Sequence, residues 1–378
     1  MDISRYRSLF PYLQGGLIYL NHAASGPLST RVVEAMQQHL KEGSEGPIDT
    51  YFKDLHTADD LRSMVARLVN AESSDRIAFT GNTSDGLNIL VSGLPWKDGD
   101  RILLNDMEFP ANVYPYLNLR QYGVEIDTVP CPDGQLTLER LEQSLRPTTR
   151  AVAISAVQFL TGYRADLAAI GDLCRSRGVL LLVDAIQAVG AVRLDVQAMK
   201  IDGMASGGQK WLMAPHGTGF LYLSQRLQGM IRQQFLGWFS VAEPWHFREY
   251  GQPLAPSARR YEGGTLNYPG LIAMRASVET LLDAGTDAVE ERIHGLIDHA
   301  VTRLEEMPGW SIISPRERDR RAGIVTVRSG SPEEAKRLFD RALQRKAVIS
   351  LREGLLRFSP HFYNTTEEFD EVLARMVE

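Results

Sequence analysis

Two residues of this chain are placed where an amine and a carboxylate could carry out chemistry. Lys210 lies in the segment SGGQKWLMAPHGTGFLYL, residues 206–223, between a small-residue loop and an apolar run. A lysine in such a place is either a solvated surface charge or a desolvated amine that can bond covalently to a carbonyl carbon. Asp184 ends the most apolar strand-like run, VLLLVDA, and Gln187 follows shortly after it. A carboxylate buried there needs a cationic partner, unless it only caps the next helix or pairs with a structural arginine.

A third feature favours phosphate binding. In FTGNTSDGLNIL, residues 79–90, a strand-like run ends in a polar turn that leads directly into an apolar helix. The free N–H groups and the positive dipole end of such a helix hold phosphate well, and Asn82, Thr83 and Ser84 add donors. The simpler alternative is that Thr83 or Ser84 is only the N-cap of this helix. No GxGxxG follows an expected strand and no GKS or GKT occurs, which disfavours dinucleotide and P-loop sites.

The elements that must position these residues alternate between strand and helix through the first two thirds of the chain, which predicts a parallel sheet covered by helices. We expect seven strands, at 76–81, 101–106, 124–130, 151–157, 179–185, 203–207 and 219–224, and helices at 29–43, 59–71, 84–94 and 164–178. Ligands of open α/β sheets bind at the carboxyl ends of strands. Asp184 and Lys210 are then expected on neighbouring strand ends, one strand–helix–strand step apart.

The pattern changes after about residue 269. Two long helices are expected at 271–285 and 288–307, followed by a strand at 323–329, a helix at 331–346, strands at 347–351 and 355–360, and a last helix opened by the capping-box pattern TTEE at 365–368. We therefore expect an α/β fold with two domains. The large one spans 16–268 and carries a mostly parallel seven-stranded sheet, and the smaller α+β domain spans 269–378, with residues 1–15 packed against it.

An imine-forming amine, a carboxylate that can pair with a protonated ring nitrogen and a phosphate site are together what pyridoxal 5′-phosphate (PLP) needs. Eight segments, in order, also resemble one family, the class V aminotransferases of fold-type I PLP enzymes, which include cysteine desulfurases, kynureninases and isopenicillin N epimerase-like proteins. The segments are YLNHAASGPLS, FTGNTSDGLNIL, NDMEFPANVYPY, ISAVQFLTGYRADLAAI, VDAIQAVGAVRLDV, SGGQKWLMAPHGTGFLYL, RYEGGTLNYPG and LRFSPHFYNTTEEFDEV.

The resemblance assigns roles around the cofactor. It implies that Lys210 forms the internal aldimine, that Asp184 pairs with the pyridine nitrogen and that Gln187 donates to the ring hydroxyl. Asn82 and Thr83 should hold the phosphate, and Phe109 should stack on the ring where many relatives have histidine.

Other assignments depart from the family pattern or concern the substrate. Desulfurase-like relatives read serine, glycine, histidine, lysine where this chain reads SGGQK, so either Ser206 still reaches the phosphate or backbone donors and Gln209 replace it. Gln158 stands where relatives carry a polar residue beside cofactor and substrate, with a solvated strand-end amide as the alternative. The threonine of EGGT, Thr265, should reach the phosphate of the neighbouring subunit in a homodimer.

The substrate-binding residues are expected from both ends of the chain. Arg357 lies in the mostly apolar run LLRFSP and, by resemblance, grips the α-carboxylate of an amino acid through two parallel hydrogen bonds, unless it is an ordinary edge-strand arginine. His22 and Ala23 should line the substrate mouth, although His22 is equally compatible with packing. Trp211 is interpreted as a core residue.

The composition of the chain limits the classes of molecule that it is expected to bind. The net charge of −6 in 378 residues gives no attraction to nucleic acid or to anionic membranes, and no apolar run is long enough to span a membrane. Two cysteines and a charged N-terminal segment indicate a cytoplasmic protein without a disulfide framework. No metal site is expected.

The cofactor alone does not define the reaction, because PLP permits transamination, racemisation, elimination and side-chain cleavage. Residues 347–360 contain no cysteine before Arg357, which disfavours a persulfide-forming desulfurase. Aminotransfer by class V chemistry is the leading hypothesis, and a cysteine-independent C–S lyase and an epimerase are the alternatives. A relative that has lost catalysis and serves as a scaffold is the non-enzyme alternative.

Overall fold

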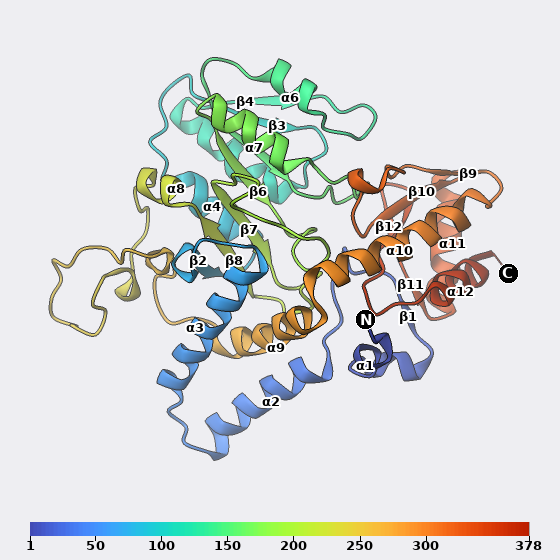
Figure 1. Ribbon diagram of the computed structural model, residues 1–378, viewed down its shortest axis with the longest axis horizontal. Coiled ribbons are helices and arrows are strands. Elements are labelled where there is room, and N and C mark those ends of the chain that lie inside the picture. The colour runs from blue at the N-terminus through green and yellow to red at the C-terminus, as the bar shows by residue number, and fades with distance from the viewer. Residues whose placement is uncertain (378) are drawn as a thin grey trace.

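Seven strands form one sheet in the order β2-β8-β7-β6-β5-β3-β4, in which β8 alone runs antiparallel to its neighbours. The computed structural model describes residues 1–377 (Figure 1). The strands are β2 (Ile77–Thr80), β3 (Arg101–Asn105), β4 (Glu125–Val129), β5 (Thr149–Ser155), β6 (Leu180–Asp184), β7 (Gly203–Gly207) and β8 (Gly219–Leu223). The predicted mostly parallel, seven-stranded sheet is confirmed.

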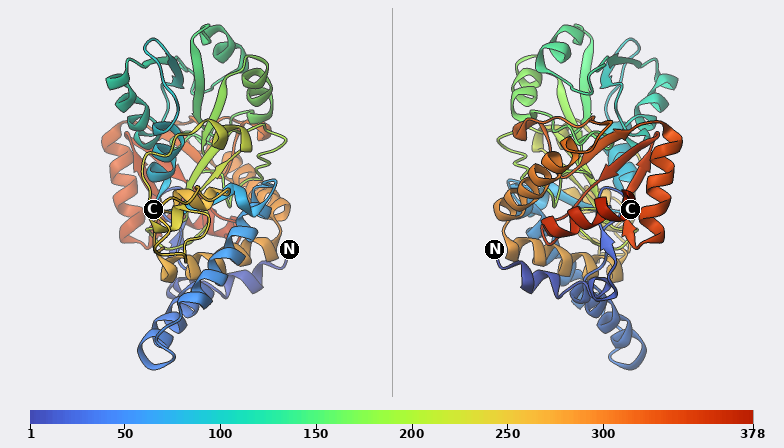
Figure 2. Two further views of the ribbon diagram at one scale, coloured as in Figure 1. Left: turned by 90° about the vertical axis from the view of Figure 1, so that its left-hand side faces the viewer. Right: turned by 90° about the vertical axis from the view of Figure 1, so that its right-hand side faces the viewer.

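Helices cover both faces of this sheet, as the two side views in Figure 2 show. The side chains of β6 point alternately to the two faces of the sheet: Leu180 and Leu182 pack on one face, and Leu181 and Val183 pack on the other. A strand buried on both faces reads as a continuous apolar run, which is why this one was conspicuous in the sequence. The first face is covered by α4 (Thr83–Ser92), α5 (Tyr114–Leu117) and α8 (Gln225–Met230), and the second by α3 (Tyr51–Leu68), α6 (Leu138–Ser144), α7 (Leu167–Ser176) and α9 (Tyr268–Ala284).

The helix α2 (Thr30–Glu45) and the helix α3 pack on α9, below the sheet in Figure 1. The helix α3 starts at Tyr51, well before the expected residue 59. Its first half continues the buried stripe through Leu55 and Ala58 toward Leu61, so the packing surface extends the helix beyond the stretch that the sequence indicated.

The connection between β6 and β7 differs from the prediction. Residues 185–202 form successive turns and no α-helix, so the expected strand–helix–strand step is wrong at this place. Gly190 adopts a left-handed φ of 94°, and a Cβ there would lie 2.5 Å from the carbonyl oxygen of Trp211. The chain turns at a glycine because the backbone after Lys210 passes too close for any side chain.

A second, antiparallel sheet lies in the C-terminal part, in the order β12-β13-β10-β9. Its strands are β9 (Trp310–Ile312), β10 (Val325–Ser329), β12 (Ser350–Arg352) and β13 (Leu355–Phe358), and the helices there are α10 (Thr286–Glu305), α11 (Pro332–Gln344) and α12 (Thr366–Val377). The predicted capping box is confirmed, since Thr365 N donates to Glu368 Oε2 (3.1 Å) and Glu368 N donates to Thr365 Oγ1 (3.3 Å).

The strand expected at 347–351 is split between two sheets. β11 (Ala347–Val348) pairs in parallel with β1 (Ile18–Tyr19), whereas β12 pairs with β13. Near α1 (Ile3–Arg7), Phe10 stacks on Tyr363 at 3.9 Å between ring centroids. The N-terminal residues thus contact the C-terminal part, and β1 pairs with it although we assigned residue 18 to the large domain. The domain limits remain a prediction.

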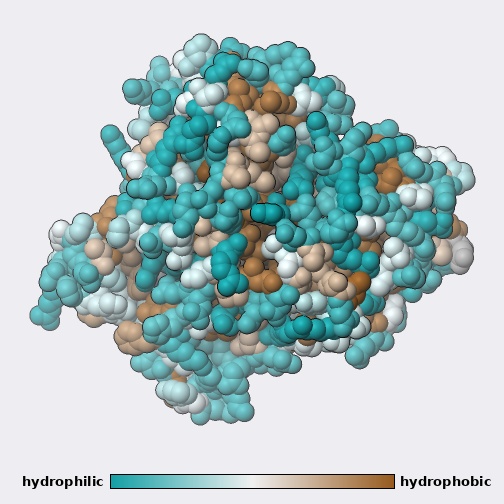
Figure 3. All heavy atoms as spheres, viewed as in Figure 1, coloured by the Kyte–Doolittle hydropathy of each residue, from teal (hydrophilic) through white to brown (hydrophobic). Residues whose placement is uncertain are grey.

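The face of the molecule in Figure 3 is mainly hydrophilic, with small hydrophobic patches. Among residues 1–377, no helix combines the length and the apolar character that crossing a membrane would require.

Candidate active site

Lys210 and Asp184 lie at the carboxyl ends of two adjacent strands. β6 ends at Asp184, which pairs in register with Ala205 of β7, and Lys210 follows shortly after β7 ends at Gly207. Burial raises the pKa of Asp184 to about 6, although a hydrogen bond from Ile186 N (3.0 Å) and the charge of Lys210 oppose the rise. Burial likewise lowers the pKa of Lys210 to about 8, against the attraction of Asp184. The structure therefore places a readily deprotonated amine beside a buried carboxylate.

The start of α4 faces the end of β7. Asn82 is the N-cap, because its Oδ1 accepts from Asp85 N (2.9 Å), so the alternative that Thr83 or Ser84 is the cap is wrong. Thr83 Oγ1 accepts from Gly207 N (2.9 Å), which joins the helix start to the strand end. Gly86 in the first turn allows the close approach, since a Cβ there would lie 2.7 Å from the Cβ of Ala205.

Ser206 takes no part in the contact between the start of α4 and the end of β7. Ala205 packs on the face of the sheet that α4 covers, so Ser206, the next residue of the strand, points to the opposite face. Its side chain is completely buried and its Oγ donates to Gly207 O (3.2 Å). Gln209 lies against Gly207, where a Cβ would collide with its amide oxygen. Of the two alternatives for the SGGQK segment, the placement favours backbone donors with Gln209.

The carboxylate of Glu108 accepts five hydrogen bonds at the place where β3 and β5 end side by side. The donors are Asn105 Nδ2 (2.6 Å), Asn112 Nδ2 (2.9 Å), Ser155 N (2.9 Å), Ser155 Oγ (2.5 Å) and Gln158 Nε2 (2.9 Å). Because a carboxylate only accepts, the amide nitrogen of Gln158 must face Glu108, and the buried Gln158 Oε1 has no partner among the described residues. The ring of the next residue, Phe109, packs edge-on against Phe159, and its centroid is 5.8 Å from Lys210 Nζ.

Arg357 is a buried guanidinium that has no carboxylate partner among residues 1–377. It is 2% exposed, donates to Phe159 O (2.5 Å) and more weakly to Ser350 Oγ (3.4 Å), and its Nε has no partner among the described residues. Burial lowers its pKa to about 10. Arg352 lies on the same face of the β12–β13 hairpin, since Ser350 pairs with Arg357 and Arg352 with Leu355. Two guanidinium groups thus share one face, and neither has a carboxylate partner among residues 1–377.

The N-terminal segment is enclosed between the two parts of the chain. His22 is completely buried, with Nδ1 3.0 Å from Ser359 O and Nε2 2.8 Å from Tyr363 OH. Burial lowers the pKa of His22 well below its usual value. Both ring nitrogens are thus used within the protein, which favours the packing role over a place at the substrate mouth. Ala23 O accepts from Gln187 Nε2 (3.0 Å), and this contact brings the segment to the strand end that carries Asp184.

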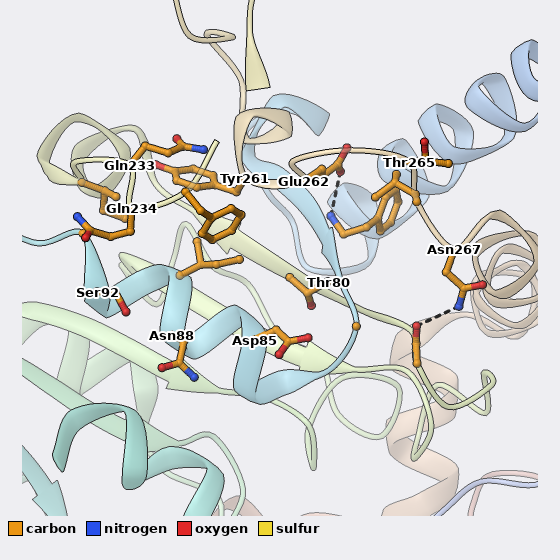
Figure 4. Close-up of a pocket in the computed structure, with 18 of the residues that line it drawn as sticks. Thr80, Asp85, Asn88, Ser92, Gln233, Gln234, Tyr261, Glu262, Thr265 and Asn267 are labelled. Carbon is orange, nitrogen blue, oxygen red and sulfur yellow. Dashed lines mark hydrogen bonds between the residues drawn. The ribbon is translucent and has the colours of Figure 1, made fainter. Parts of the chain in front are cut away.

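Thr265 lines a cavity of about 580 Å³ between α4 and residues 231–235 and 261–267, which Gly81 and Asp85, the neighbours of the helix start, also line. Figure 4 shows it across the cavity from Asp85 and Asn88 of α4. The segment is anchored by Glu262, which accepts from Arg62 (2.6 Å) and from Phe79 N (3.0 Å). Lys210, Asp184 and Arg357 do not line this cavity.

The structure thus brings most of the predicted residues to one region. They are Lys210, Asp184, Gln187, Ala23, Gln158, Phe109, Thr83, Asn82 and Gln209, with Arg357 approaching from the second sheet. Sequence reasoning missed Glu108, Arg352 and the contacts of Trp211. Glu108 stands directly before Phe109 in the sequence. For Arg352, the available signal was its spacing from Arg357, which puts both arginines on one face of a short hairpin.

Known proteins that are similar to this chain belong to the family that the sequence motifs indicated. Residues 18–372 match the family model described as aminotransferase class-V. A probable cysteine desulfurase of Methanothermobacter thermautotrophicus is 29% identical over 370 residues, covering 93% of this chain and 92% of that protein.

Two solved structures of the protein C-DES resemble the chain along its length. One, a lysine-to-alanine mutant with glycine covalently linked to the PLP cofactor, has a TM-score of 0.89 at 26% identity and covers 98% of both chains. The other, described as the cystine C-S lyase in complex with its product cysteine persulfide, has a TM-score of 0.88 at 26% identity and covers 97% of this chain and 98% of that one. The expected resemblance and the fold-type I architecture are confirmed.

Proposed function

The chain belongs to the aminotransferase class-V family of PLP-dependent enzymes, and we propose that it acts at the α-carbon of an amino-acid substrate with Lys210 as its reactive amine. The residues present fit the cofactor. A lysine with a lowered pKa, a buried carboxylate that pairs with no arginine among residues 1–377 and a helix start joined to the lysine-bearing strand supply the three groups that PLP requires.

Each residue then has a proposed task. PLP, when bound, withdraws electrons from the α-carbon of an attached amino acid. Lys210 accepts and returns the α-proton, since burial lowers the pKa of its amine to about 8 and the neutral amine is a base. Asp184 holds the ring nitrogen in its protonated state, and the start of α4 with Asn82 and Thr83 holds the phosphate. Gln187 donates to the ring hydroxyl, and Phe109, whose ring lies 5.8 Å from Lys210 Nζ, covers the ring.

The observation that carries the proposal is the guanidinium of Arg357, which forms no ion pair within the described part of the chain. A fully buried cation without an acidic partner is costly unless a ligand supplies the opposite charge. An α-carboxylate matches the fork geometry and the charge of Arg357, and Arg357 is close enough to Lys210 to lower the pKa of its amine. We therefore propose that Arg357 binds the carboxylate of the substrate whose α-carbon Lys210 serves.

Aminotransfer is the leading reaction. A C–S lyase that uses no cysteine nucleophile is the second candidate, because Arg352 and Arg357 share one face of their hairpin and suit a substrate with two carboxylates, such as cystine. A persulfide-forming desulfurase is disfavoured: Cys131 and Cys174 are both buried, and burial raises the pKa of each thiol to about 12.

We also propose a homodimer in which Thr265 contributes to the neighbouring subunit's phosphate site. Its place on a large cavity that Lys210, Asp184 and Arg357 do not line supports this arrangement, because a second copy would fill the cavity. The cytoplasmic location expected from the sequence belongs to the same proposal.

A substrate screen tests the proposal. The purified protein is first titrated with PLP and followed by its visible absorption, and a protein that remains colourless would favour the scaffold alternative. Amino acids are then offered singly, with and without a keto-acid acceptor, while keto acid, pyruvate and sulfide are measured separately. Acceptor-dependent keto acid supports aminotransfer, whereas pyruvate and cysteine persulfide formed from cystine without an acceptor, the persulfide being read as sulfide after a thiol reductant is added, support the lyase. Turnover of no amino acid by the PLP-loaded protein would refute the proposed activity.

A further inference from the structure

Trp211, the residue after Lys210, is completely buried and is held at two points. Its indole Nε1–H donates to Gln187 Oε1 (2.8 Å), and its main-chain carbonyl accepts from His361 Nε2 (2.9 Å). His361 Nδ1 accepts from Phe362 N (2.8 Å), so the neutral ring carries its proton on Nε2. Burial lowers the pKa of His361 to about 4, which keeps the ring neutral and both contacts intact at ordinary pH.

Two glycines lie directly against Trp211. A Cβ at Gly323 would lie 2.4 Å from Cη2 of the ring, and a Cβ at Gly190 would lie 2.5 Å from the Trp211 carbonyl oxygen. The two glycines come from the C-terminal part and from the β6–β7 connection, so both parts of the protein enclose the residue. The direction of the indole N–H is therefore fixed by packing as well as by its hydrogen bond.

The fixed N–H determines which way the Gln187 amide is turned. An indole N–H can only donate, so the amide oxygen of Gln187 must face Trp211 and the amide nitrogen must face away. One N–H of that nitrogen donates to Ala23 O (3.0 Å). The hydrogen bonds of the described residues leave the second N–H unused, on a residue one turn beyond Asp184.

We propose that Trp211 is a positioning residue that holds the Gln187 amide so that its second N–H donates to the ring hydroxyl oxygen of PLP. This inference rests on the proposed function, because it requires PLP at Lys210. The orientation matters because the opposite turn would bring the amide oxygen against the ionised ring oxygen, which repels it. A donor in that place favours the ionised ring oxygen and lowers the pH at which the visible band of the bound cofactor titrates.

The test compares single and double variants by the pH titration of this band and by the dissociation constant of PLP. Trp211→Phe removes the indole N–H and keeps most of the ring volume, and Gln187→Ala removes the amide. Each is expected to raise the titration midpoint by about 1–2 pH units, the size expected for one hydrogen bond to a charged oxygen. The double variant is expected to shift no further than Gln187→Ala alone, because Trp211 acts only through Gln187.

A matched control is available in Trp96. Its indole Nε1 donates to Val91 O at 2.8 Å, the same length as the bond of Trp211, but on a main-chain carbonyl away from the site. Trp96→Phe is expected to leave the midpoint unchanged. Gln187→Glu provides a second arm that leaves Trp211 intact, since the carboxylate still accepts from the indole but donates nothing, and its midpoint is expected to rise as well.

The outcomes separate the two proposals. An unchanged midpoint in folded Trp211→Phe, or shifts that add up in the double variant, would overturn the positioning role while leaving the proposed function standing. If Trp211→Phe does not fold, an unchanged midpoint in Gln187→Glu would overturn it. A wild-type protein without a visible band in the presence of PLP would refute the proposed function and the positioning role with it.

Discussion

Replacing Arg357 separates a substrate-binding cation from a structural one. The guanidinium has five N–H groups, of which the protein uses one on Phe159 O and one, weakly, on Ser350 Oγ. The remaining N–H groups, including the unpartnered Nε–H, are available to a carboxylate. Arg357→Lys keeps a positive charge but offers one flexible ammonium, which cannot satisfy Phe159 O and both oxygens of a carboxylate together.

The expected fall in kcat/KM follows from the burial of the Arg357 side chain. Arg357 is 2% exposed, so the substrate's carboxylate would be a desolvated partner, and removing one member of such a pair costs roughly 2–5 kcal/mol. That free energy corresponds to a fall in kcat/KM of about 30- to 5,000-fold for Arg357→Ala. Arg357→Lys is expected to recover only a small part, because its charge remains while the planar fork is lost.

The assay measures kcat/KM and the visible cofactor band in the same preparations. The band should keep its wild-type intensity, since Arg357 is proposed to touch the substrate and not the cofactor. Arg328→Lys, an exposed arginine on β10 of the same sheet, is the control and should change neither quantity. Parallel loss of folded protein or of cofactor with activity would make Arg357 structural, and unchanged efficiency would refute the assigned carboxylate site.

The remaining predictions concern the amine, its neighbouring carboxylate and the cysteines. Lys210→Ala should keep the fold, measured by circular dichroism, and lose activity and the visible band of the bound cofactor; a variant that retains both would remove the central proposal. Asp184→Asn should still bind PLP but lose most of kcat, because a neutral partner no longer keeps the ring nitrogen protonated, and near wild-type turnover would mean that Asp184 is only structural. PLP uptake by the cofactor-free protein should speed up as the pH rises and level off above about 8, because burial lowers the pKa of the Lys210 amine and the neutral amine is the reactive form; a rate that still climbs toward pH 10 would contradict this. The double variant Cys131→Ser, Cys174→Ser should keep its activity, since both thiols are buried and protonated, and complete loss of activity in the folded variant would reopen a cysteine-based mechanism.

The strands and the reactive residues on them were predictable from local pattern. β6 reads as an unbroken apolar run because both of its faces are buried, and its last residue, Asp184, is marked by being a carboxylate at that point. Motif order then identified the family, because residues that bind one cofactor recur in the same sequence of segments. The β6–β7 connection was mistaken for a helix, since its small residues suit a helix locally and only the close approach of the chain at Trp211 excludes one.

The directions and partners of the side chains required the tertiary structure. Ser206 is adjacent to the glycine that bonds Thr83 and still points to the other face, because side chains alternate along a strand. Trp211 looked like an ordinary core residue until its indole N–H was found on Gln187, a contact between residues on separate strand connections. By itself the sequence determined the strand pattern, the family and the reactive amine, because these depend on residue type and order. The tertiary structure was needed to show that the Arg357 guanidinium has no acidic partner among residues 1–377 and to show which way the Gln187 amide is turned. Both depend on contacts between segments that are distant in the sequence.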